Sequence, residues 1–93
     1  MDIYQQIIRE TDNITQELIC QRRDFHKYAE TGWFEMRTSS IIARKLTTLG
    51  YEVLTGDRVC KKDARMGVPS KEALDTQYQR AIAQGADPEF VKD

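Results

Sequence analysis

Apolar side chains recur at helical spacing through residues 3–29, interrupted by polar and charged positions. This pattern predicts one long amphipathic helix whose apolar face carries Ile3, Ile7, Ile14, Leu18, Phe25 and Ala29. Asp2 is placed to cap its first turn, because a carboxylate there can accept hydrogen bonds from free backbone N–H groups. The helix is expected to end before Gly32, which supplies backbone freedom.

A second helix is predicted over residues 33–49, with an apolar row made by Ile42, Leu46 and Leu49. Gly32 is the expected N-cap, and Glu35 lies three residues later, where its side chain can reach back to the cap. Gly50 follows the last turn, where a glycine takes the left-handed conformation without steric strain.

The second half of the chain alternates short ordered elements with turns. Residues 51–55 predict a short strand, and residues 57–69 are polar and irregular. Ser70 is a suitable cap for a third helix over residues 71–84. Asp87 and Pro88 then carry the start signals of a fourth helix.

The single strand decides between two architectures. A strand of five residues needs a partner for its backbone N–H and C=O groups. The first architecture is therefore an incomplete α/β unit of the order helix–helix–strand–helix, mostly α within this chain, that forms the N-terminal fragment of a larger domain over residues 1–93. The alternative is a small helical protein in which residues 51–55 are an extended linker.

Composition narrows the class of partner. The chain has 93 residues, of which 40% are hydrophobic, and its 14 basic and 15 acidic residues give a net charge of −1. That balance argues against a nucleic-acid or membrane-surface binder, which needs a basic surface. The first ten residues lack the basic and apolar regions of a secretory signal, so we expect a cytoplasmic protein with Cys20 and Cys60 as reduced thiols.

Few side chains suggest catalysis. The only histidine, His26, could be a base or a metal ligand, but it has no partner ligand nearby in sequence and suits a helix terminus. Glu30 and Glu35 could act as paired carboxylates, although capping is the commoner role. Cys60 lies in a locally basic run that contains Arg58, Lys61, Lys62 and Arg65. These charges could lower the pKa of the Cys60 thiol or bind an anion, although a solvated loop is the simpler interpretation.

Trp33 and Phe34 stand side by side where the second helix is expected to begin. We interpret them as a hydrophobic staple that fixes the entry of the chain into that helix, in preference to a platform for a ligand. The sequence alone therefore contains no convincing active site.

Several segments together resemble a known family. Residues 22–30, RRDFHKYAE, resemble the R-R-x-x-H-x-x-x-E opening of the metallopeptidases and amidohydrolases of peptidase family M20, and residues 46–53 continue that pattern. Most members have Pro before the first Glu, where this chain has Ala29. That departure, with the segments 56–60 and 63–69, resembles the branch that hydrolyses aminobenzoyl-glutamate.

The resemblance implies an α/β catalytic domain, a dinuclear zinc or manganese centre, and cleavage of p-aminobenzoyl-glutamate to p-aminobenzoate and glutamate in the cytoplasm. It also implies partners: the rest of the catalytic domain, and a related B subunit that pairs with the A subunit of this branch. The family's metal-binding motifs do not occur in this sequence. No catalytic or metal-binding residue is therefore carried over, and the chain alone is expected to be inactive and to bind no metal.

One substrate-binding residue is suggested. Arg65 lies in a segment that this branch adds, and the implied substrate carries two carboxylates, which a guanidinium binds with two parallel hydrogen bonds. A structural salt bridge from Arg65 to Asp63 or to another acid is an equally good interpretation.

The competing function is a small helical interaction module that self-associates through its first helix. In a heptad register, the a and d positions of that helix are mostly apolar. They are occupied by Tyr4, Ile7, Ile14, Leu18, Phe25 and Tyr28, with few polar exceptions.

Overall fold

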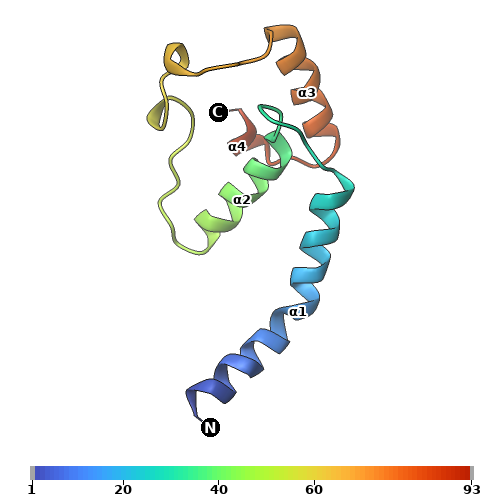
Figure 1. Cartoon of the computed structure of the whole chain (residues 1–93), viewed down its shortest axis with the longest axis vertical. Helices are drawn as coiled ribbons and strands as arrows, with labels where there is room; N and C mark the ends of the chain where they lie inside the picture. Colours follow the sequence, from blue (N-terminus) through green and yellow to red (C-terminus); the bar gives the residue numbers. More distant parts are fainter. Residues whose placement is uncertain (1, 93) are drawn as a thin grey trace.

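The computed structural model describes residues 2–92, and its ordered elements are helices (Figure 1). Four are α-helices and two are single 3₁₀ turns, and in chain order they are α1 (Ile3–Lys27), α2 (Met36–Thr48), η1 (Gly56–Arg58), η2 (Lys62–Ala64), α3 (Lys71–Ala83) and α4 (Pro88–Val91). The helical order predicted for the first, second, third and fourth helices is therefore confirmed.

Helix α1 begins as the sequence predicted. The Asp2 carboxylate accepts a hydrogen bond from the backbone N–H of Gln5 at 2.8 Å, and the Gln5 side chain accepts one from the N–H of Asp2. The helix ends at Lys27, two residues before the predicted end, and Tyr28 closes its last turn. Most of α1 leads away from the other helices, which gives the molecule extents of 55 × 28 × 22 Å (Figure 1).

Helix α2 begins at Met36, three residues after its predicted start. Trp33 has φ 68°, in the left-handed region, so the helix cannot include it. The expected caps are also wrong: Glu35 is the N-cap and makes no side-chain capping bond. The Glu30 carboxylate caps the helix instead, accepting from the backbone N–H groups of Arg37 at 2.9 Å and Thr38 at 2.7 Å.

The predicted strand over residues 51–55 is wrong. These residues have no regular structure, although Thr55 keeps an extended backbone with φ −137° and ψ 166°. A strand requires a second extended segment alongside it, and residues 2–92 contain no strand. The described part of the chain is therefore helical, and the linker alternative describes residues 51–55 correctly.

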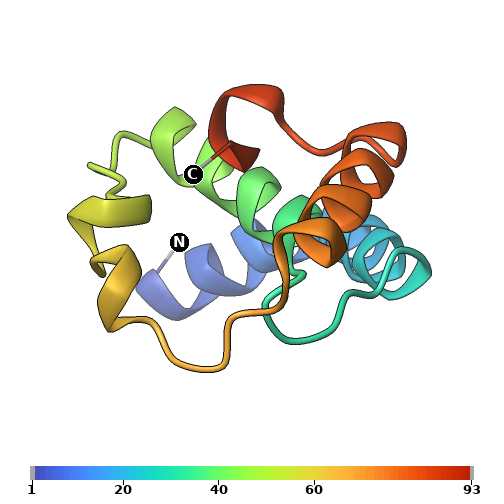
Figure 2. The ribbon, with the colours of Figure 1, turned by 90° about the horizontal axis from the view of Figure 1, so that it is seen from above.

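Helices α2, α3 and α4 form the packed part of the molecule (Figure 2). Small residues lie where the helices approach, and Ala43, Ala81 and Ala86 are buried among them. Ser40 joins α2 to α4, because its Oγ donates to the carbonyl of Arg37 at 2.8 Å and accepts from the N–H of Asp87 at 3.0 Å. Helix α3 starts at the predicted cap, where Ser70 Oγ accepts from the N–H of Ala73 at 3.2 Å.

Candidate functional site

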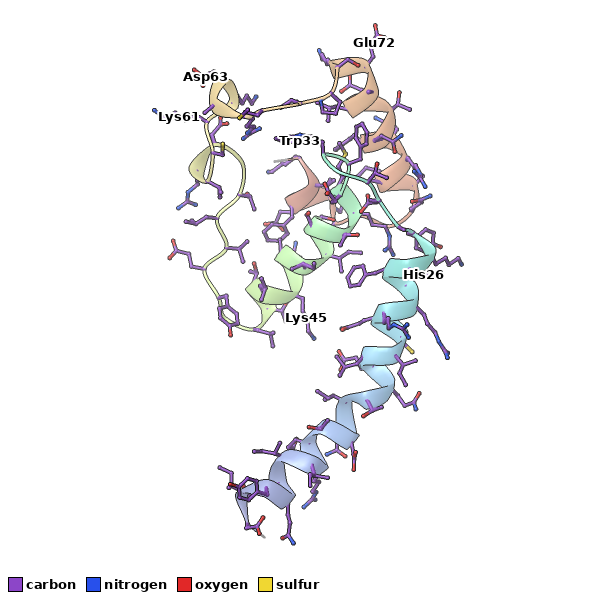
Figure 3. The ribbon with its side chains drawn as sticks, viewed as in Figure 1. His26, Trp33, Lys45, Lys61, Asp63 and Glu72 are labelled. Atoms are coloured by element: carbon purple, nitrogen blue, oxygen red, sulfur yellow. The ribbon has the colours of Figure 1, made fainter. Side chains whose placement is uncertain are left out.

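A hollow of about 620 Å³ lies between α2, α4 and the segment from Thr55 to Met66. Most of its walls are apolar, with side chains from Trp33, Met36, Ala43, Val59, Met66 and Phe90. Trp33 comes from the turn before α2 and points toward the segment that bears Lys61 and Asp63 (Figure 3). A concave apolar surface with a few polar groups is a typical small-molecule site, so this hollow is the candidate site.

Arg65 lies in the wall of this hollow with its side chain 19% exposed. Its Nη2 donates to Asp57 Oδ1 at 3.1 Å, and its Nε and Nη2 donate to the carbonyl of Cys60 at 3.1 and 2.9 Å. The acid that pairs with Arg65 is therefore Asp57 rather than Asp63. These bonds tie η2 back to η1 and fix the guanidinium at the rim, whereas its role toward a substrate stays a prediction.

The other basic side chains of this segment point into solvent. Lys61 and Lys62 are exposed, and Arg58 reaches Glu52 only at 3.9 Å with both side chains largely exposed. Cys60 is exposed and its Sγ lies 3.7 Å from the carbonyl of Lys61. The run is therefore a solvated loop, as its simpler interpretation predicted.

His26, Glu30 and Glu35 do not form a common site. His26 is exposed near the end of α1 and lies far from Lys61 and Asp63 (Figure 3). Glu30 is engaged with the first turn of α2, and Glu35 sits on the rim of the hollow. Cys20 is exposed on α1, on a different element from Cys60.

The donor set does not fit a metal centre. Within residues 2–92 no three His, Cys, Asp or Glu side chains come together in a group that could hold a metal ion. The dinuclear centre implied by the resemblance would need about five or more protein ligands. We therefore assign no metal-dependent step to this chain.

Among residues 2–92 the buried charged side chain is Arg37, which the sequence did not single out. It is 6% exposed, its Nη2 donates to both carboxylate oxygens of Asp24 at 2.9 Å, and its Nε donates to the carbonyl of Gln84 at 2.7 Å. Its guanidinium also lies 4.3 Å from the ring centre of Tyr28. Arg37 thus joins the end of α1, the start of α2 and the end of α3.

The motif at residues 22–30 gave a signal for this junction. Glu30 is a fixed residue of that motif, Asp24 and Tyr28 occupy its variable positions, and all three contact the first turn of α2. In this structure the motif therefore positions two helices relative to each other.

A second arginine anchors α4. The Arg44 guanidinium donates to Asp87 at 2.7 Å and to Glu89, and it lies 4.9 Å from the ring centre of Phe90. The hydrogen bond from Arg44 is the largest influence on Asp87 and holds the pKa of that carboxyl below its ordinary value of 3.8. This anchor fixes Phe90, which forms one wall of the hollow.

No helix among residues 2–92 combines the length and the apolar character that crossing a lipid bilayer requires.

Known proteins are similar to this chain in sequence and in fold, although no protein-family model matches it. The chain is 39% identical over 80 residues to the A subunit of p-aminobenzoyl-glutamate hydrolase from Escherichia coli (strain K12), which covers 86% of the chain and 18% of that protein. It is 46% identical over 70 residues to indole-3-acetyl-aspartic acid hydrolase of Enterobacter agglomerans, which covers 75% of the chain and 16% of that protein.

A solved structure agrees with these relatives. The crystal structure of an aminobenzoyl-glutamate utilization protein from Klebsiella pneumoniae matches with a TM-score of 0.86 and 38% identity, over 94% of this chain and 22% of that one. The chain thus spans less than a quarter of the length of each of these three proteins. The resemblance found in the sequence is confirmed: over most of its length, the chain is similar to a segment of the A subunit of p-aminobenzoyl-glutamate hydrolase.

Proposed function

We propose that this chain is a structural segment of a cytoplasmic, metal-dependent amidohydrolase of the peptidase family M20 type. The observation that supports it best is the agreement of sequence and fold, with 39% identity to the Escherichia coli protein and a TM-score of 0.86 to the Klebsiella pneumoniae protein. The two curated relatives are named for related substrates: p-aminobenzoyl-glutamate and indole-3-acetyl-aspartic acid each join an aromatic acyl group to an acidic amino acid by an amide bond. The proposed reaction is hydrolysis of such an amide.

The chain supplies scaffold to this reaction. The full sequence has one histidine and two cysteines. Cys20 lies on α1 six residues before His26, and Cys60 lies in the segment between η1 and η2. Zinc or manganese ligands would therefore come from the remaining part of the enzyme, and the 93-residue chain alone would be inactive. Helices α1, α2 and α3, held together at Arg37, would form one side of an α/β catalytic domain.

The same proposal explains much of the exposed apolar surface. Leu46, Leu49, Tyr51 and Leu54 are more than a third exposed at the end of α2 and in the segment that follows. In the intact enzyme the rest of the catalytic domain would cover this surface, and residues 51–54 would lie beside a neighbouring strand. A related B subunit would complete the assembly.

Arg65 is the one side chain we propose for substrate binding. It is held at the edge of the candidate hollow by Asp57 and by the Cys60 carbonyl, so its guanidinium is oriented before a ligand arrives. A carboxylate of an acidic amino acid is the ligand that such a group binds best.

The test is a chimera. The matching segment of the Escherichia coli protein is replaced by this chain, and the chimera, together with its B subunit, is assayed on p-aminobenzoyl-glutamate and on indole-3-acetyl-aspartic acid. We expect hydrolysis of at least one substrate, because the junction at Arg37 and the hollow are kept intact.

A matched chimera that carries Arg37→Met is the control, and it should be poorly folded and weakly active. A folded chimera that hydrolyses neither substrate would contradict the proposal. Activity on the indole compound alone would assign the chain to the second relative's substrate.

A further inference from the structure

Helix α1 carries six large apolar side chains that are exposed, with exposed fractions between 46% and 75%. They lie on one side of the helix at residues Ile3, Tyr4, Ile7, Ile8, Ile14 and Leu18, and we call them the α1 stripe. Contiguous exposed apolar patches of this size mark interaction sites on soluble proteins.

Most of the stripe lies on the first half of α1, whereas the ion pairs that fasten α1 to α2 lie in its second half. Glu17 pairs with Lys45 at 3.5 Å, and Asp24 pairs with Arg37, so both contacts lie in that half or at its start. The first half of α1 leads away from α2, α3 and α4 (Figure 1).

Charge is distributed unevenly along α1 and its cap. Residues 2–17 carry four acidic side chains and one basic side chain, which are Asp2, Glu10, Asp12, Glu17 and Arg9. Residues 18–27 carry three basic side chains, and their one acid, Asp24, is already paired with Arg37. An antiparallel pair brings Arg22 at the basic end of one copy toward Asp2 at the cap of the other, whereas a parallel pair would set every charge of α1 beside the same charge of its partner.

We propose that, in the 93-residue chain, the α1 stripe binds the α1 stripe of a second copy in an antiparallel pair. A two-fold axis near Thr11 places Tyr4 of each copy beside Leu18 of the other, and Ile7 beside Ile14. The packed helices of the two copies then lie at opposite ends of the pair and do not collide. Arg22 of each copy comes near Asp2 of the other.

The buried area is sufficient for such a dimer. Six side chains of roughly 100 Å² exposed area each contribute about 600 Å² per copy, or about 1,200 Å² in total, which is the lower end of the range for specific interfaces. We therefore expect a dimer that forms in the micromolar range. The inference concerns a surface that contains no part of the candidate hollow, so it stands or falls separately from the proposed hydrolase.

Sedimentation velocity of the full chain over a range of concentrations tests the pairing. Ile14→Lys places a charge at the centre of the stripe and should raise the dimer dissociation constant at least about tenfold. Gln16→Lys adds the same side chain two residues away on the opposite side of α1 and should leave the constant unchanged. Circular dichroism should confirm that both variants keep their helices.

A chain that stays monomeric at every concentration would overturn the proposal, and so would a dimer that Ile14→Lys leaves intact. Cysteine pairing tests the direction in a chain whose own Cys20 and Cys60 are replaced by serine. An antiparallel pair gives disulfides only when the Tyr4→Cys and Leu18→Cys variants are mixed. Disulfides in the Tyr4→Cys variant alone would show a parallel pair and overturn the antiparallel one.

Discussion

The carboxylate of Asp24 accepts two hydrogen bonds, both from Nη2 of Arg37 and both 2.9 Å long, across the junction of α1 and α2. The arginine is almost fully buried, while the side chain of Asp24 is 41% exposed. A charge buried in this way is stable only while its partners satisfy it. Arg37 therefore holds three helices in a fixed arrangement and depends on all three.

Arg37→Met should lower the free energy of unfolding by about 2–4 kcal/mol, because it leaves Asp24 and the carbonyl of Gln84 without their donor. Arg37→Lys should restore little of this loss, since an ammonium group cannot reach both acceptors and stack on Tyr28 at once. Urea unfolding followed by circular dichroism measures the change.

Arg44→Met is the matched control for that experiment. Arg44 also pairs with carboxylates and stacks on an aromatic ring, but its side chain is 45% exposed. Solvent screens exposed ion pairs, so this variant should lose clearly less stability than Arg37→Met. Equal losses would show that burial does not set the importance of Arg37.

Sequence periodicity and capping residues predicted the starts of α1 and α3 well because their caps are local. Asp2 and Ser70 cap their helices as expected, and α3 ends within one residue of its predicted end. The Arg37 junction depends on contacts between residues 13 and 47 positions apart, and one arginine among many gives no local sign of them. The motif identified Glu30, but it did not identify Asp24 or the arginine that Asp24 binds.

Glu30→Ala should destabilise the fold by about 1–2 kcal/mol, because two backbone N–H groups at the start of α2 lose their acceptor. Glu35→Ala is the control: Glu35 was predicted to reach back to a cap at Gly32, yet its side chain makes no capping bond, and the change should stay within about 0.5 kcal/mol. Thermal melts of the two variants compare them directly. A larger loss for Glu35→Ala would support the predicted contact of Glu35 with the cap and contradict capping by Glu30.

Gly50→Val should destabilise the fold by about 1–2 kcal/mol. Gly50 has φ 95° and open space around its Cα, so the loss would come from backbone strain alone and not from a steric clash. Gly32→Val is the control, since Gly32 has equally open surroundings and does not have a positive φ. An unchanged melting temperature for Gly50→Val would show that the turn after α2 can be made by another residue.

The strand over residues 51–55 was mispredicted for a physical reason. Tyr51 and Val53 have the side chains of a strand, and Thr55 keeps the extended backbone of one. Strand formation also requires a second segment, and the sequence pattern of one segment cannot show whether that neighbour is present. The same limit applies to Arg65, whose partner Asp57 lies eight residues away across two 3₁₀ turns.

Acid should loosen α4 through Asp87. The hydrogen bond from Arg44 lowers the pKa of this carboxyl in the folded state below its ordinary value of 3.8. A carboxylate whose pKa is lowered by folding stabilises the fold fully when the pH is above its pKa in the unfolded state. That contribution is lost as the pH falls through its pKa in the folded state. The loss is therefore expected below about pH 4, and stability between pH 5 and pH 8 should not depend on this group.

Arg44→Met removes the cause of that shift, so its stability should depend less on pH below about 4 than the stability of the unchanged chain. Asp87→Asn removes the titrating group and should flatten the same part of the curve. Lys45→Met, which removes a neighbouring exposed cation of α2 that contacts Glu17, should leave the curve unchanged. Urea midpoints measured from pH 3 to pH 7 give these curves. If Arg44→Met and Lys45→Met behaved alike, the acid sensitivity would come from general charge repulsion and not from the Arg44–Asp87 pair.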